Sequence, residues 1–145
     1  MLGALKNWFS SEVAEPESAD HLVQKAAAFL LFEVALVDRH IGDQERDQLL
    51  KSVLAATSLS QADAEVLLEQ VESEAEALTS HHRFIRTLVD ELDEDERGLV
   101  IEQMWRVAYA DGELDRYEEQ FIRRVADLLY LPHSRYIQAK LKAQG

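Results

Sequence analysis

Two stretches of the sequence decide the fold: residues 34–45, VALVDRHIGDQE, and residues 107–118, VAYADGELDRYE. They match at a constant offset of 73 positions. Each has an Asp ending an apolar run, an aliphatic residue three positions later and a Glu seven positions after the Asp. Because short loops make consecutive helices antiparallel neighbours, each stretch predicts the corner of a helix-loop-helix hairpin, with Ile41 or Leu114 filling the corner.

The acids shared by the two corners are the candidate binding residues. If the hairpins pack around a pseudo-two-fold axis, four carboxylates converge into one oxygen-rich cluster. Like charges held closely are unfavourable unless protons, bases or a cation compensate them, so the pattern is compatible with a hard divalent metal. The predicted ligands are Asp38, Glu45, Asp111 and Glu118.

Helix capping is the alternative interpretation of these acids. Asp115 and Glu118 have the spacing of a capping box, and Glu45 and Glu118 fall in first helical turns, where the helix dipole favours acids. Capping does not explain Asp38 and Asp111, because a negative charge at the C-terminal end of a helix is unfavourable unless something offsets it.

Helical periodicity extends through the rest of the chain, and no segment alternates like a half-buried strand. The segment from Asp20 to about Arg39 is too apolar at its centre to have a solvated face. The sequence therefore predicts an all-α bundle of about seven helices. These are expected at about 20–39, 43–56, 60–78, from 79 or 80 onward, 93–110, 115–130 and from Pro132 to the C-terminus.

The first nineteen residues read as a short helix followed by a polar linker that contains Pro16, with the main domain at 20–145. Trp8 lies at helical spacing from Leu2 and Leu5. The opening helix either docks on the core or anchors the chain to a membrane surface or partner, and docking is preferred because so short a helix binds weakly.

Composition narrows the functions that this chain can have. Hydrophobic residues make up 47% and charged residues 30%, as in one folded domain, and the absence of Cys excludes thiolate chemistry. A net charge of -13 disfavours nucleic acid as a partner. The apolar run at 26–37 is too short to span a membrane, and without a secretion signal we expect a cytoplasmic protein.

Two further features bear on chemistry. Glu33 interrupts the most apolar helix, and Arg106 occupies the equivalent position of the second copy, so a buried Glu33–Arg106 ion pair is predicted in preference to a catalytic carboxylate. The sequence contains no zinc-peptidase box, Glu-x-x-His pair or phosphate-binding loop. We therefore expect no enzyme activity.

The segment Asp111-Gly112-Glu113-Leu114 followed by Glu118, with its degenerate copy at 38–45, resembles the TerB-like fold of tellurite-resistance proteins, which also occurs in membrane-anchored J-domain co-chaperones. The resemblance covers about residue 20 to the C-terminus. It implies a compact helical bundle whose acidic corner positions are proposed to chelate metal, in a family associated with stress responses and membrane-linked protein assemblies. The first copy departs from the pattern, with Arg39 and His40 where the second has Gly112 and Glu113.

The resulting hypothesis is a cytoplasmic stress-response module that binds a divalent metal, such as Ca, Mg, Mn or Zn, and contacts a protein partner. Membrane contact would come only through the opening helix or a membrane-bound partner. The alternative is a metal-free acidic interaction scaffold, and a weaker third option is hydrolysis at a carboxylate-bound metal. Arg39 would neutralise the acid cluster, or His40 would join it as a nitrogen ligand.

Overall fold

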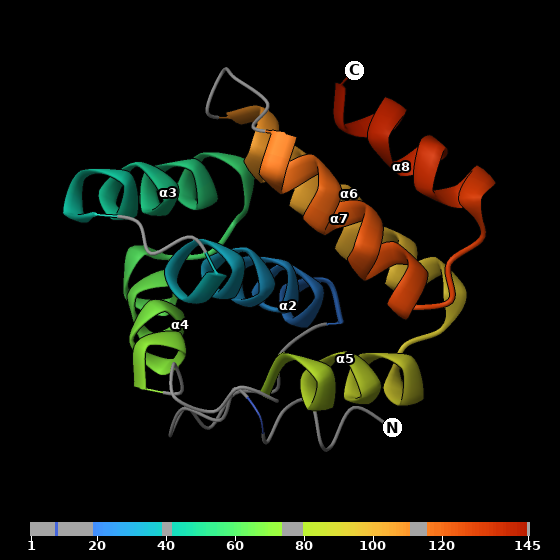
Figure 1. The fold of residues 1–145 in the computed structure, drawn as a ribbon, viewed down its shortest axis with the longest axis horizontal. Coiled ribbons are helices and arrows are strands. Elements are labelled where there is room, and N and C mark those ends of the chain that lie inside the picture. Colours follow the sequence, from blue (N-terminus) through green and yellow to red (C-terminus); the bar gives the residue numbers. More distant parts are fainter. Residues whose placement is uncertain (1–7, 9–18, 39–41, 74–79, 111–115, 145) are drawn as a thin grey trace.

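Seven α-helices and one π-helical turn make up the computed structural model, which describes Trp8 and residues 19–38, 42–73, 80–110 and 116–144 (Figure 1). No strand occurs in these residues, so the predicted all-α bundle is confirmed. The elements are α2 (Ala19–Glu33), η1 (Val34–Asp38), α3 (Asp43–Ala56), α4 (Gln61–Ser73), α5 (Ser80–Glu91), α6 (Glu94–Ala110), α7 (Arg116–Leu128) and α8 (His133–Gln144).

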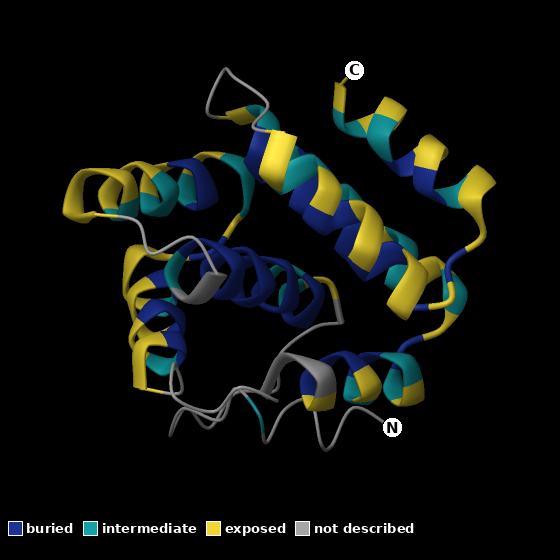
Figure 2. Cartoon of the chain, in the orientation of Figure 1, coloured by how far each residue is buried: buried dark blue, intermediate teal, exposed yellow. Residues whose placement is uncertain are grey.

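Helix α2 lies at the centre of the core. Every residue from Lys25 through Ala35 is buried, including Lys25 and Glu33 (Figure 2). A helix that is apolar on all sides has to be covered on all sides, which is why the other helices surround it. The segment predicted as one helix to about Arg39 instead changes at Val34 to a π-helical turn that ends at Asp38.

Helix α6 joins the two halves of the molecule. It packs against α2 and α3 from the first half and against α7 and α8 from the second. Its buried side chains include Met104 and Trp105, both fully inaccessible to solvent. Burial of large side chains such as these contributes about 1.5–3 kcal/mol each, so α2 and α6 together account for much of the apolar burial.

The internal repeat is longer than the sequence comparison indicated. Helix α7 has 13 residues where α3 has 14, so beyond these helices the offset becomes 72. At that offset Leu59 matches Leu131, exposed by 5% and 6%, in the loops that precede α4 and α8. The repeating unit is therefore three helices, α2-α3-α4 and α6-α7-α8, with α5 between the copies.

Two predicted helix starts are confirmed by their hydrogen bonds. The backbone N–H of Asp63 donates to Ser60 Oγ at 3.1 Å at the start of α4. At the start of α6 the N–H of Glu96 donates to Asp93 Oδ1 at 2.8 Å, and the N–H of Asp93 donates to Glu96 Oε1 at 3.0 Å. This reciprocal pair is a capping box, and it satisfies two N–H groups that the helix itself leaves unpaired.

The contact between the opening segment and the core is confirmed at Trp8. Its ring centroid lies 5.0 Å from that of Phe84 in α5 and 6.3 Å, edge-on, from that of Phe29 in α2. Gln70 of α4 donates its side-chain N–H to the Trp8 carbonyl at 2.8 Å. The rest of 1–18 lies outside the described residues, so the linker and the domain boundary remain predictions.

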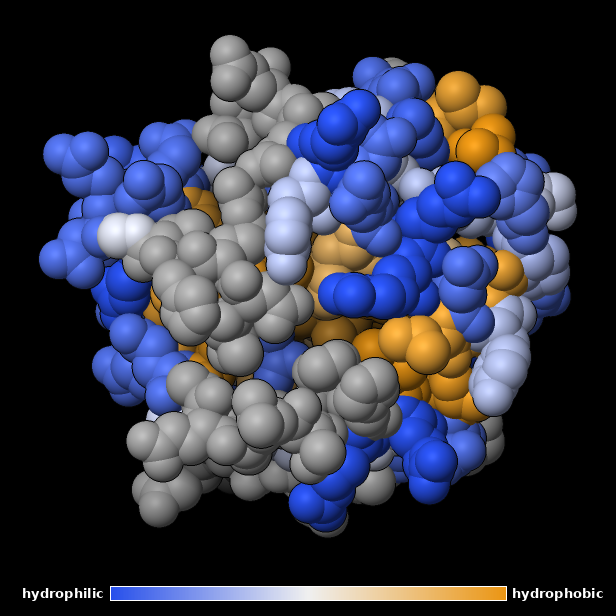
Figure 3. Space-filling view, in the orientation of Figure 1, coloured by the Kyte–Doolittle hydropathy of each residue, from blue (hydrophilic) through white to orange (hydrophobic). Residues whose placement is uncertain are grey.

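None of the helices in the described residues combines the length and the apolar character needed to cross a bilayer. The space-filling view accordingly shows mostly hydrophilic side chains on the visible face, with apolar ones in patches between them (Figure 3).

Helix α7 ends in a left-handed turn at a residue with a side chain. Tyr130 has a φ of 56°. The Leu131 N–H donates to the Ala126 carbonyl at 3.0 Å and the Tyr130 N–H donates to the Asp127 carbonyl at 3.0 Å, which is the Schellman pattern. Glycine is favoured at this position because a Cβ is unfavourable in the left-handed region.

We predict that Tyr130→Gly raises the free energy of unfolding by about 0.5–1 kcal/mol, because the left-handed strain is relieved. The Tyr130 side chain is 77% exposed, so little packing is lost. Urea unfolding followed by circular dichroism measures the change. Tyr130→Ala, which keeps a Cβ, is the control and should show no comparable gain; equal stabilities of the two variants would contradict the prediction.

Candidate functional site

The first corner lies between η1 and α3. Asp38 is the last residue of the π-helical turn, although its side chain lies outside the described set, as do Arg39 and His40. Glu45 is the third residue of α3 and is exposed. Its Oε2 lies 3.0 Å from where a Cβ would stand at Gly42, the N-cap residue, so this carboxylate folds back over the helix start, where the dipole favours an acid.

The second corner lies between α6 and α7. Glu118 is the third residue of α7, the position that Glu45 has in α3, but it is half-buried whereas Glu45 is exposed. Asp111, Gly112, Glu113 and Leu114 lie outside the described residues, as does Asp115, the proposed capping partner.

Glu45 and Glu118 lie in the first turns of different helices. Figure 1 shows the first turn of α3 at one end of the molecule and the first turn of α7 beside the end of α6. Within the part of the chain that the structure describes, no three acidic or histidine side chains form a group that could hold a metal ion. The convergence of Asp38, Glu45, Asp111 and Glu118 therefore stays a prediction, because Asp38 and Asp111 are outside the described side chains.

The predicted pairing of Glu33 with Arg106 is wrong. Arg106 donates from Nε and Nη2 to Glu102 Oε2, at 3.1 and 2.9 Å. Glu102 lies four residues before Arg106 on the same helix, so this pair forms without any contact between the repeats. Glu33 is 6% exposed and takes part in other interactions.

Three arginines, Arg46, Arg106 and Arg135, form ion pairs with acids of the same or a neighbouring helix. Arg46, next to Glu45 on α3, donates to Glu72 Oε1 of α4 at 2.9 Å, and this hydrogen bond raises the pKa of Arg46. Arg106 and Arg135 are held by acids of α6. Half-exposed pairs of this kind contribute little stability each, but they fix which surface charges remain uncompensated.

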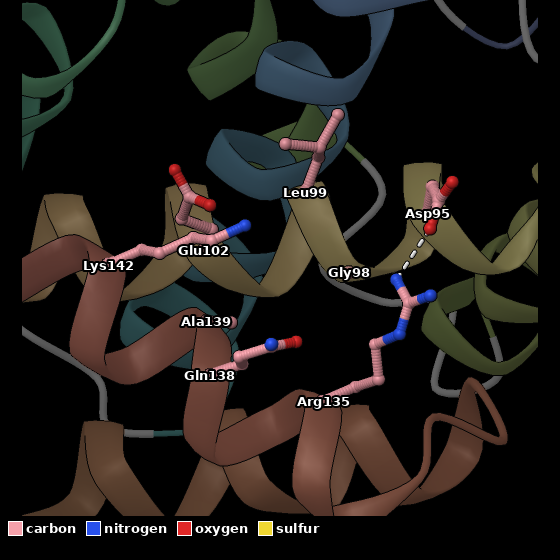
Figure 4. A pocket seen from close by; sticks show the side chains of 8 residues that line it. All are labelled: Asp95, Gly98, Leu99, Glu102, Arg135, Gln138, Ala139 and Lys142. Atoms are coloured by element: carbon pink, nitrogen blue, oxygen red, sulfur yellow. Dashed lines mark hydrogen bonds and ion pairs between the residues drawn. The ribbon is translucent and has the colours of Figure 1, made fainter.

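A groove with a volume of about 190 Å³ lies between α6 and α8 (Figure 4). The sequence did not indicate it. The Arg135–Asp95 hydrogen bond, 2.6 Å long, closes one end, and it raises the pKa of Arg135. A Cβ at Gly98 would have nothing within 4 Å, so this part of the α6 backbone faces open space. The lining residues are Asp95, Gly98, Leu99 and Glu102 of α6 and Arg135, Gln138, Ala139 and Lys142 of α8.

A signal for this groove was present in the sequence, since α8 contains bases and no acid. It was not recognised because the partner surface on α6 depends on how the two helices pack. Nothing in the groove resembles a catalytic arrangement: its acids are paired with arginines, and its centre is a glycine and an alanine.

Beneath the groove lies an aromatic cluster that holds α8 on α6. Trp105 stacks on Tyr109 at 5.7 Å between centroids and packs against Tyr136 at the same distance. The pKa of Tyr136 is raised, first because burial disfavours the phenolate and second because Glu119 adds negative charge nearby.

The comparison with protein families matched one family. The family described as tellurite resistance protein TerB covers residues 24–141. The comparisons with curated proteins and with solved structures found no match. The predicted likeness to J-domain co-chaperones is thus not among these findings.

The raised pKa of Tyr136 predicts a loss of stability at high pH. A group whose folded-state pKa lies above its unfolded value, about 10 for Tyr, contributes stability that is fully present below that value and is lost as pH rises through the folded pKa. Urea midpoints measured from pH 9 to 11 should fall more steeply for the native protein than for Tyr136→Phe. The control is Tyr130→Phe, at an exposed position; equal slopes for native protein and Tyr136→Phe would rule out the effect.

Proposed function

Because the chain belongs to the tellurite resistance protein TerB family, we propose that it is a non-enzymatic module of a cytoplasmic, tellurite-type stress response that acts through contacts with other proteins. In this proposal a divalent cation held by the corner acids Asp38, Glu45, Asp111 and Glu118 controls those contacts. The family match spans both three-helix repeats, so it includes both corners.

The observation that supports the metal is the equivalent placement of Glu45 and Glu118, each the third residue of the helix that follows a corner. Carboxylate oxygens suit hard divalent cations such as Ca²⁺, Mg²⁺ or Mn²⁺. A bound cation would offset the repulsion between the corner acids and stabilise the loops that carry them. Asp38 and Asp111 would act as the ligands that helix capping does not account for.

A second candidate is a metal-free acidic scaffold. The carboxylate of Glu45 lies against the helix start at Gly42, an arrangement that the helix dipole favours without a metal. The same first-turn position of Glu118 admits that explanation as well.

Isothermal titration calorimetry with Ca²⁺, Mg²⁺, Mn²⁺ and Zn²⁺ separates the two candidates. We expect saturable binding of at least one cation to the native protein, and its loss in Asp111→Ala, because a corner ligand is removed. Asp90→Ala is the matched control, since Asp90 is an exposed acid on α5 away from both corners. Absence of binding at millimolar metal would favour the metal-free scaffold, and equal binding by both variants would place the cation elsewhere.

A further inference from the structure

The last helix is basic in an otherwise acidic chain. Helix α8 carries Arg135, Lys140 and Lys142 and no acid, whereas the whole chain has a net charge of -13. Arg135 is neutralised by Asp95 and lies 3.8 Å from Glu94. The two lysines form no ion pair with the residues that the structure describes: Lys140 lies over the Trp105 ring at 5.2 Å, and Lys142 is exposed. Two positive charges on α8 therefore have no acidic partner among the described residues.

Two aliphatic side chains point outward from the same helix. Ile137 is 38% exposed and Leu141 is 59% exposed. They are four residues apart, so they share one face, and Gln138 and Lys142 beside them line the groove. Figure 3 shows apolar side chains reaching the surface at upper right, over the outer side of α8. The groove and this apolar pair form one continuous surface.

The internal repeat shows that packing does not require these aliphatic residues. At the offset of 72, Ile137 and Leu141 correspond to Glu65 and Glu69 of α4, and both glutamates are exposed. The same helix position in the same three-helix unit thus carries charge in one copy and aliphatic side chains in the other. Single exposed apolar residues are common on protein surfaces. Here, however, the equivalent exposed positions of α4 carry glutamates, which are the kind of side chain expected at a position that only contacts solvent.

We propose that the outer face of α8, made of Ile137, Gln138, Leu141 and Lys142, docks an acidic amphipathic helix of a partner protein. The apolar side of that helix packs on Ile137 and Leu141, and its carboxylates pair with Lys142 and Lys140. The proposal rests on the protein-contact part of the proposed function and is independent of the metal.

Two other occupants fit the charges less well. A second copy docking α8 against α8 brings the bases of one helix against the bases of the other. An anionic membrane is recognised by clusters of about four to eight bases, whereas α8 has two without an acidic partner in the described residues. Charge complementarity therefore selects an acidic helix.

The test uses fluorescence anisotropy with a labelled peptide of about 18 residues, long enough to form a helix, with Leu at i, i+3, i+4 and i+7 and Glu at most other positions. The native protein should bind it and should prefer it over the same peptide with Lys in place of Glu. The double variant Ile137→Glu with Leu141→Glu should bind at least about tenfold more weakly. It should keep its helical circular dichroism, because α4 already carries Glu at both equivalent positions.

Two further variants test the lysine contact and control for the added negative charge. Lys142→Glu should weaken binding about threefold and reduce its dependence on salt, because an exposed charge contact is lost. Gln61→Glu with Ala62→Glu adds the same number of negative charges at exposed positions of α4, and should bind like the native protein.

Three outcomes would overturn the proposal: equal weakening by both double variants, no preference for the acidic peptide, or no binding at submillimolar protein. Dimerisation in sedimentation that the α8 variant abolishes would assign the face to a second copy. Binding to phosphatidylserine vesicles that the variant abolishes would assign it to a membrane. Failure here leaves the calorimetric result for Asp111→Ala unchanged, so the two proposals are judged separately.

Discussion

The packing of α2 against α6 is the constraint on which the rest of the structure depends. Helix α2 is buried on every side from Lys25 to Glu33, and its partner α6 buries Met104 and Trp105 completely. An all-round apolar helix cannot lie at a surface, so α3 and α4 cover one part of the pair and α7 and α8 cover another. Polar and charged groups are consequently displaced to the helix ends and outer faces, where the candidate sites lie.

The two three-helix repeats differ in backbone structure. Helix α6 remains α-helical to Ala110, whereas its counterpart changes at Val34 to a π-helical turn. A π turn closes i→i+5 hydrogen bonds in place of i→i+4, so the backbone of the first repeat departs from that of the second over Val34–Asp38. Helix α3 also packs on α6 across the repeats. The two repeats are therefore similar in sequence but differ in the backbone of the helix that precedes each corner.

Charge is distributed by local pairing more than by long-range contacts between the repeats. Arg106 is satisfied within its own helix, Arg46 links α3 to α4, and Arg135 links α8 to α6. These ion pairs neutralise basic side chains, which are outnumbered by acidic ones in this chain. What remains unpaired among the described residues of α8 is a small positive surface beside exposed aliphatic side chains, at positions where α4 of the first repeat carries Glu65 and Glu69.

Sequence alone was sufficient for the helical class, the bounds of α3, the start of α6 near Asp93 and the TerB family, because periodicity and capping are local properties that residue spacing records. Burial of α2 also followed from its composition. The predicted Glu33–Arg106 pair failed for a local reason, because Arg106 pairs with Glu102 of its own helix. The π turn and the α6–α8 groove were decided by tertiary packing. They depend on how side chains from distant segments compete for the same partners, and spacing along the chain does not encode that competition.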